Sequence, residues 1–299
     1  MYDKSDPRAA LAPQSAPAAP KTGLVAEPQE AYFYRDAPQV SDEAGKTWML
    51  RGHNFVLAWT EAAQGGTFAR TDQPDEYVVL LPEHGAVIEW NGTTTEVPGR
   101  SIAFVPAGDS KITLPHGGRL TRLFTVRSTD LAEACSNARG YDTPRSHIPP
   151  FEAWPDPVGG WKVRHYSLDV EPETGRFGRI FRCTTMMVNV LDPFEGPRDA
   201  TKMSPHHHDD FEQCSLALEG QFDHHLRWTW TTDMADWRDD RKVSMGAPSA
   251  LVIPPPVVHT TRASGEGHNQ LVDIFCPPRT DFSEKPGWVL NADDYPMPE

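Results

Sequence analysis

The sequence has few cysteines, and none is placed as in a disulfide scaffold or a thiolate metal site. The four are Cys135, Cys183, Cys214 and Cys276, and no two of them form a Cys-x-x-Cys pair. So sparse a set in 299 residues does not predict a disulfide framework. The sequence also lacks a run of eighteen apolar residues and an apolar stretch behind a basic N-terminus. Neither a membrane span nor a secretory signal is predicted, and we expect a cytoplasmic location.

The sequence has fewer basic than acidic residues. Lys and Arg total 28 against 42 Asp and Glu, which gives a formal net charge of −14. A protein this acidic repels a phosphate backbone and an anionic membrane surface. We therefore expect a small-molecule substrate rather than a nucleic-acid or membrane partner.

Long helical stretches are also missing, because 29 Pro and 22 Gly interrupt the chain throughout. Short apolar segments at Tyr77–Leu81, Ala86–Trp90 and Ser101–Val105 predict strands instead. The Asn91-Gly92 pair after the second segment predicts a tight hairpin. The only convincing helical turn is at 130–135, with Thr129 as its cap. We predict an all-β protein.

Composition divides the chain into two halves. Residues 1–30 are rich in Pro and Ala, which predicts either a flexible tail or an arm that crosses onto a partner subunit. Residues 141–165 are rich in Pro and Gly, which predicts a linker. The predicted domains are therefore 31–140 and 166–299.

The two halves resemble each other. Residues 99–106 are similar to 246–254, and the strand that begins near Glu76 is similar to the strand that begins near Gln213. The two matched segments lie further apart along the chain in the second half than in the first, which predicts an insertion within 228–242. Two copies of one β-domain, the second with an insertion, account for the pattern.

A group of histidines in the second half carries the strongest chemical signal. His206 and His208 are two residues apart, so on a strand both side chains point to one face. Two imidazoles that converge in this way are suited to a divalent transition metal. Gln213 or Glu212 can supply an oxygen ligand, and the remote His259 can complete the set.

This arrangement resembles the cupin family. In the first cupin motif, His-x-His is followed by three or four residues, Glu, six residues and Gly. Here His206 and His208 are followed by four residues, Gln213, six residues and Gly220, with Gln in place of the usual Glu. His259 lies in a looser version of the second motif. The resemblance implies two tandem jelly-roll barrels, with one divalent metal (Fe, Mn, Ni or Zn) held by His206, His208, Gln213 and His259, and with Glu212 as the alternative to Gln213.

The first half departs from the cupin pattern. The positions equivalent to the His-x-His residues are Ala69 and Thr71, and that of the second-motif histidine is near Lys111. We therefore expect a degenerate barrel without metal ligands. In the second half His224 is predicted either to lie beside the metal and transfer a proton or to be a core residue.

Cupins support many reactions, so two classes of function stay open. The first is a metal-dependent enzyme, either an isomerase or lyase acting on a carbohydrate acid or other carboxylate, or an Fe(II)-dependent dioxygenase. The resemblance to small cupins that act on uronates favours the former. The second class is a non-catalytic binding or storage protein. Because cupins commonly pair through their sheets, we expect a homodimer.

Overall fold

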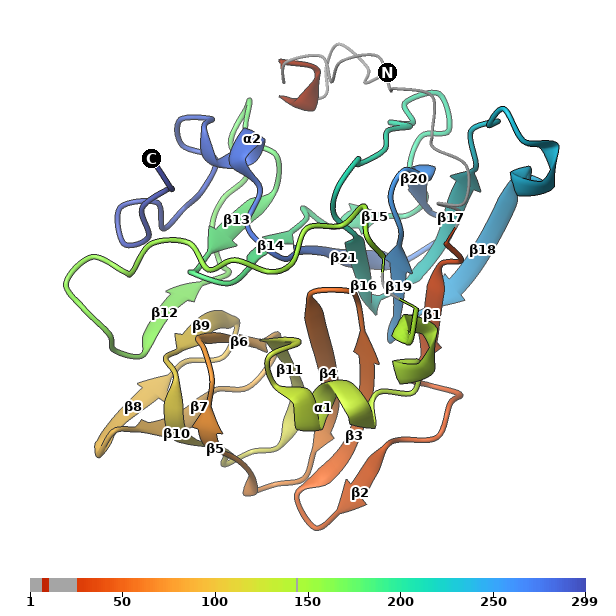
Figure 1. The fold of residues 1–299 in the computed structure, drawn as a ribbon. Coiled ribbons are helices and arrows are strands. Elements are labelled where there is room, and N and C mark those ends of the chain that lie inside the picture. The colour runs from red at the N-terminus through yellow and green to blue at the C-terminus, as the bar shows by residue number, and fades with distance from the viewer. Residues whose placement is uncertain (1–6, 11–25, 144) are drawn as a thin grey trace.

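The computed structural model describes residues 7–10, 26–143 and 145–299. It consists almost entirely of strands, which form two barrels stacked on each other (Figure 1). Among the described residues, no helix is long and apolar enough to cross a membrane.

The first barrel has one seven-stranded and one four-stranded sheet. The larger sheet has the order β12-β9-β6-β11-β4-β3-β2 and the smaller has the order β5-β10-β7-β8. Their bounds are β2 Val40–Asp42, β3 Gly45–Arg51, β4 Phe55–Ala62, β5 Gly66–Gln73, β6 Tyr77–Leu81, β7 Ala86–Trp90, β8 Thr93–Val97, β9 Ser101–Val105, β10 Gly108–Leu114, β11 Gly118–Thr125 and β12 Arg164–Ser167.

The second barrel repeats this plan. Its larger sheet has the order β1-β19-β16-β21-β14-β13, with β15 also paired to β21, and its smaller sheet has the order β18-β17-β20. Their bounds are β1 Gln29–Tyr32, β13 Arg179–Arg182, β14 Met187–Val190, β15 Phe194–Glu195, β16 Gln213–Glu219, β17 Gln221–Arg227, β18 Arg241–Gly246, β19 Ser249–Ile253, β20 Val258–Ala263 and β21 His268–Phe275. The described helices are short, with bounds η1 Pro7–Ala10, α1 Thr129–Ala134, η2 Ala138–Tyr141, η3 Met234–Asp236 and α2 Thr280–Ser283.

The two larger sheets pack face to face, and alternation along each strand separates two cores. In β4, Leu57 and Trp59 contribute to the apolar cluster shared by the two sheets, whereas Val56 and Ala58 face the interior of the first barrel. In β16, Leu216 contributes to the same shared cluster. Ala217 of the same strand belongs to an apolar cluster inside the second barrel. Gln213 lies four residues before Ala217, so alternation along the strand directs its side chain into the second barrel too. One strand thus supplies both the contact between barrels and a candidate site residue.

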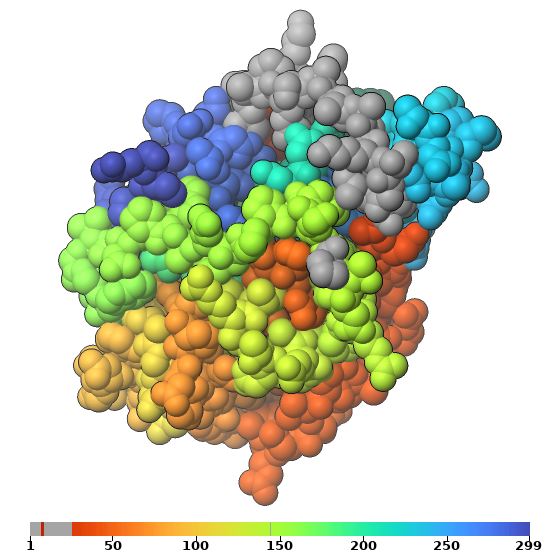
Figure 2. All heavy atoms as spheres, in the orientation of Figure 1, coloured from red at the N-terminus to blue at the C-terminus, as the bar shows by residue number. Residues whose placement is uncertain are grey.

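Each barrel takes one strand from the other half of the chain. Strand β1 pairs with β19 in the second barrel, and β12 pairs with β9 in the first. The predicted domain boundaries at 30/31 and 165/166 each run through one of these exchanged strands. In Figure 2 the segment that joins the halves, coloured yellow-green, crosses the surface of both.

The predicted strands at Tyr77–Leu81, Ala86–Trp90 and Ser101–Val105 are confirmed. The hairpin is confirmed too, since Asn91 and Gly92 both have positive φ, at 46° and 73°, as a two-residue turn between β7 and β8 requires. The predicted helix exists as α1, but its cap is Ser128 rather than Thr129.

The internal repeat is correct in outline and shifted by one residue in detail. Tyr77 pairs with the last residue of β9 as Gln213 pairs with the last residue of β19, so Tyr77 is the counterpart of Gln213 and Glu76 that of Glu212. A shift of one residue moves a side chain to the other face of a sheet. The predicted insertion is confirmed, because residues 228–240 replace the two-residue turn of the first barrel.

Candidate metal centre

Three histidines meet at the mouth of the second barrel. His259 belongs to β20, while His206 and His208 lie in the segment before β16 and not on a strand, contrary to expectation. His206 nevertheless forms an isolated antiparallel bridge with His259 through two backbone hydrogen bonds of 3.0 and 2.7 Å. One ring nitrogen from each of the three histidines lies within 4.8 Å of the others.

Backbone carbonyls orient two of these imidazoles. Nδ1 of His206 lies 2.9 Å from the carbonyl of Ser204, and Nδ1 of His259 lies 2.9 Å from that of Val257. A carbonyl only accepts, so in the neutral ring the proton sits on Nδ1 and Nε2 carries the lone pair. This is the arrangement that outer hydrogen bonds impose on metal-binding histidines.

Gln213 brings an oxygen to the same point. Its Oε1 lies 3.0 Å from Nε2 of His208 and 3.3 Å from Nε2 of His259. Its Nε2 donates hydrogen bonds to Asp273 at 3.0 Å and to Ser215 at 3.1 Å. A carboxylate accepts hydrogen bonds and donates none, so the amide nitrogen of Gln213 must face Asp273 and the amide oxygen must face the histidines. Three imidazoles and an amide oxygen make a donor set that fits a divalent transition metal.

The histidines are held neutral. Burial lowers the pKa of His206 and of His208 well below the usual range, and nearby positive charges act in the same direction. Burial also lowers the pKa of His259 to about 4. Metal ligation requires a deprotonated imidazole, so at neutral pH the ligands need lose no proton to bind a cation.

Glu212 directly precedes β16, and its side chain takes part in a contact between the halves rather than in the histidine cluster. Its carboxylate pairs with Arg145 and accepts hydrogen bonds from the backbone N–H of His53 at 2.6 Å and the hydroxyl of Tyr141 at 3.2 Å. Burial raises its pKa, and Arg145 opposes that rise. The geometry therefore favours Gln213 over Glu212 as the oxygen donor beside the three histidines.

His224 lies inside the second barrel on β17. Its Nδ1 is 2.9 Å from the hydroxyl of Thr261, and burial lowers its pKa to about 3. It is not among the residues that line the cavity at the histidine cluster. This placement favours the core alternative for His224.

The first barrel offers no equivalent centre. Among residues 7–10, 26–143 and 145–299, only His206, His208 and His259 form a group of three potential ligands. Lys111 forms an ion pair with Glu89. Glu76 accepts hydrogen bonds from Tyr295 at 2.7 Å and from Thr184, and so joins the two halves much as Glu212 does.

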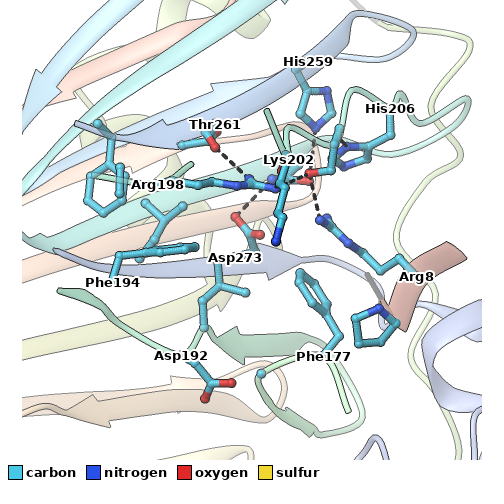
Figure 3. Close-up of a pocket in the computed structure, with 18 of the residues that line it drawn as sticks. Arg8, Phe177, Asp192, Phe194, Arg198, Lys202, His206, His259, Thr261 and Asp273 are labelled. Carbon is cyan, nitrogen blue, oxygen red and sulfur yellow. Dashed lines mark hydrogen bonds between the residues drawn. The ribbon is translucent and has the colours of Figure 1, made fainter. Parts of the chain in front are cut away.

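The histidine cluster opens into a cavity of about 420 Å³ (Figure 3). His206, His259 and Gln213 lie at one side of it, and the rings of Phe177, Phe194 and Phe222 provide apolar wall. Among the residues that the structure describes, the charged lining comprises four basic residues, Arg8, Arg176, Arg198 and Lys202, and three acidic residues, Asp192, Asp199 and Asp273. The volume is in the range of small-molecule sites.

The sequence-based search missed Asp273, Arg8 and Arg198. Asp273 could have been found, since it is the one charge in an apolar run, and alternation places it on the same face as Leu271 and Phe275. Nothing in the sequence marks Arg8, which reaches the cavity from a Pro- and Ala-rich segment far away along the chain.

No protein-family model and no curated protein matches the sequence. Solved structures do match. An oxalate decarboxylase from Lactobacillus farciminis, in complex with formate, has a TM-score of 0.57 at 14% identity over 86% of this chain and 89% of that one. A variant of the Bacillus subtilis oxalate decarboxylase has a TM-score of 0.55 at 13% identity over 85% and 78% of the two chains. The chain has a bicupin fold.

A third structural match is AerE from Microcystis aeruginosa, with a TM-score of 0.55 at 8% identity over 79% of this chain and 93% of that one. At identities this low, the similarity establishes the fold of this bicupin and no more. Its chemistry has to be argued from the site.

Proposed function

We propose that this bicupin is a metal-dependent enzyme of the lyase or isomerase class that acts on a small carboxylate, such as a carbohydrate acid. The observation that carries the proposal is the convergence of His206, His208, His259 and Gln213 beside a cavity that three of them, His206, His259 and Gln213, help to line. The formate-bound oxalate decarboxylase with the same fold supports a carboxylate as the substrate class.

The ligand set explains why an anion is the expected substrate. All four ligands are neutral, so a bound divalent cation would keep its full charge and polarise a carbonyl or carboxylate oxygen of the substrate. The phenyl rings of the lining add apolar wall to the cavity, and electrostatic attraction is stronger beside apolar groups than in bulk water.

Metal binding is tested by replacing His206, His208 and His259 singly with Ala. Each variant should lose the metal and keep the fold, because apolar strand packing and not the metal forms the core. His207→Ala is a matched control, since its side chain is paired with Asp209 and not with the cluster. Mass spectrometry measures the metal content of each variant, and far-UV circular dichroism checks its fold. If a variant kept full metal occupancy, the replaced histidine would not be a metal ligand.

The reaction class is tested with the metal-loaded protein and a panel of hydroxy, keto and uronic acids. Product formation without oxygen consumption supports a lyase or isomerase. Iron content together with substrate-dependent oxygen uptake would identify a dioxygenase instead. Metal binding with no turnover of any acid would identify a binding protein.

A further inference from the structure

We propose that Phe211 is a positioning residue for the metal centre, because its ring holds the imidazole of His208 where that imidazole can bind the cation. The inference rests on the proposed function, since it concerns a residue that supports one of the proposed metal ligands. Phe211 has no atom that could bind a cation, and it does not line the cavity beside the histidines. It therefore acts only through His208.

His208 lacks the hydrogen bond that orients the other two imidazoles. Nδ1 of His206 and Nδ1 of His259 each lie 2.9 Å from a backbone carbonyl. Nδ1 of His208 is buried and has no hydrogen-bond partner in the described part of the chain, and only 2% of the residue is exposed. A histidine that binds a metal usually donates from its second ring nitrogen to an acceptor, and this bond fixes the ring. The ring of His208 has to be fixed by another kind of contact.

Aromatic packing takes the place of that hydrogen bond. The ring of Phe211 stacks on His208, with centroids 4.4 Å apart and an interplanar angle of 25°. Phe275 makes an edge-on contact with each of these two rings, at centroid distances of 6.0 Å to His208 and 5.8 Å to Phe211. Both are favourable geometries for aromatic pairs. Because the two phenyl rings are perpendicular to each other, they restrict the imidazole in two directions.

The chain around Phe211 is anchored by its own contacts. Phe211 is followed by Glu212, whose carboxylate joins the two halves, and by Gln213, whose amide donates to Asp273. The guanidinium carbon of Arg279 lies 5.4 Å from the centroid of the Phe211 ring. A side chain can hold a metal ligand in position only if neighbouring contacts hold that side chain in turn. Phe211 meets this condition.

Phe211 also lines a second cavity, of about 820 Å³, whose lining does not include the three histidines. Space on this side allows a slightly larger ring at position 211. We therefore expect Phe211→Tyr to keep the stacked contact with His208. Phe211→Leu keeps an apolar side chain but removes the flat ring.

The first test is calorimetric titration of these two variants and the wild type with Mn²⁺. Phe211→Leu should lower Mn²⁺ affinity about tenfold, the scale of loss seen when a group that orients a metal ligand is removed. Release of Mn²⁺ to EDTA should be faster by a similar factor. Phe211→Tyr should bind Mn²⁺ as the wild type does. Far-UV circular dichroism checks that both variants are folded.

Phe177→Leu is the matched control for metal binding. Phe177 and Phe211 are both half-buried and pack against the same apolar cluster. The ring of Phe177 contacts Phe282 and Trp288, however, rather than a histidine. This variant should keep the Mn²⁺ affinity of the wild type.

The second test is NMR of the metal-free protein with labelled histidine, in which the signals of His208 are identified by their loss in His208→Ala. In Phe211→Leu the ring signals of His208 should broaden, because the imidazole is no longer confined. The signals of His206 and His259 should stay sharp, since backbone carbonyls still hold those rings.

Undiminished Mn²⁺ affinity in Phe211→Leu, an equal loss in Phe211→Tyr or in Phe177→Leu, or unchanged His208 signals in Phe211→Leu would each overturn the positioning role. Failure of the wild type to take up Mn²⁺ would overturn the proposed function instead. The NMR comparison, which needs no metal, then decides whether Phe211 holds His208.

Discussion

At the scale of single residues, the contact with Asp273 gives a physical reason for Gln213 at the proposed ligand position, where the cupin motif usually has glutamate. The Asp273 carboxylate requires a donor, and the Gln213 amide supplies one at 3.0 Å while its oxygen faces the histidines. A glutamate at position 213 would place two carboxylate oxygens against each other, and like charges at that distance disfavour ionisation of both.

This reasoning predicts the behaviour of two variants. Gln213→Glu alone should bind Mn²⁺ no more tightly than the wild type, because repulsion by Asp273 offsets the added attraction to the cation. Combining it with Asp273→Asn removes the repulsion, and affinity should then rise about tenfold. Metal titration of the three proteins side by side decides this, and tighter binding by the single variant would contradict it.

Glu212→Gln is the companion variant that tests the assignment of the ligand. It should leave Mn²⁺ affinity unchanged and lower the free energy of unfolding by about 3 kcal/mol, because it leaves Arg145 without its buried partner. Urea unfolding and metal titration are both needed. Loss of metal affinity in this variant would make Glu212 the ligand and remove Gln213 from the site.

His224 gives a pH-dependent prediction. Burial lowers its pKa to about 3, whereas the unfolded value is near 6.5, so below pH 6.5 the unfolded chain takes up a proton that the folded chain does not. The folded state should therefore lose about 1.4 kcal/mol per pH unit from this residue as the pH falls from about 6.5 toward 3.

The measurement compares the wild type with His224→Gln by urea unfolding at pH 7.5 and pH 5. The wild type should lose about 2 kcal/mol more than the variant between these values. An equal loss in both proteins would show that His224 is protonated, or exposed to water, in the folded state.

At the scale of elements, β1 connects the N-terminal part of the chain to the second barrel. Phe33, directly after β1, stacks on Trp59 of β4 with ring centroids 5.3 Å apart and an interplanar angle of 9°. Its backbone N–H also donates to the carbonyl of Pro248. One residue thus contacts both halves of the chain.

Phe33→Ala should therefore lower the free energy of unfolding by about 3–5 kcal/mol, the usual cost of emptying a buried phenyl site. Tyr34→Ala is the control, since 53% of Tyr34 is exposed, and it should cost less than about 1 kcal/mol. Urea unfolding of both variants checks this. A small effect of Phe33→Ala would mean that β1 contributes little to the contact between the barrels.

The elements also show how far the sequence could predict the fold. Strand segments, the Asn91-Gly92 hairpin and the insertion at 228–240 follow from local patterns, and the structure has all of them. The repeat could not be aligned to the residue, because in a strand of continuous apolar residues such as Tyr77–Leu81 nothing marks which face each side chain takes.

The exchanged strands β1 and β12 were unpredictable for a different reason. Strand β12 pairs with β9 across 60 residues and β1 pairs with β19 across more than 200, and pairing over such separations leaves no local signal. The segment around β1 also resembles the Pro- and Ala-rich sequence before it. The same distinction between local and long-range signals applies to the candidate site. The resemblance to the cupin motif implies the three histidines and leaves Gln213 and Glu212 as alternatives, whereas Arg8 reaches the cavity only through the tertiary fold.

At the scale of the whole molecule, the two barrels form one interdependent unit. Their larger sheets share a single apolar cluster that includes Trp59 and Leu80 from the first barrel and Leu216 and Val252 from the second. The exchanged strands and the buried Glu212–Arg145 pair add contacts that neither half can make alone. Separation of the halves would expose the shared cluster to water and break the Glu212–Arg145 pair.

We therefore predict that residues 166–299 do not fold as an isolated domain, although they contain all four proposed metal ligands. This fragment lacks β1, so one edge of β19 is unpaired, and it exposes the cluster face of β16 and β19 to water. In calorimetry, residues 26–299 should unfold in one transition, with the calorimetric enthalpy equal to the van't Hoff enthalpy, and the fragment should aggregate or lack near-UV circular dichroism. Two separate transitions in the longer chain, or a monomeric fragment that binds Mn²⁺ with full affinity, would show that the first barrel is dispensable for the fold of the second.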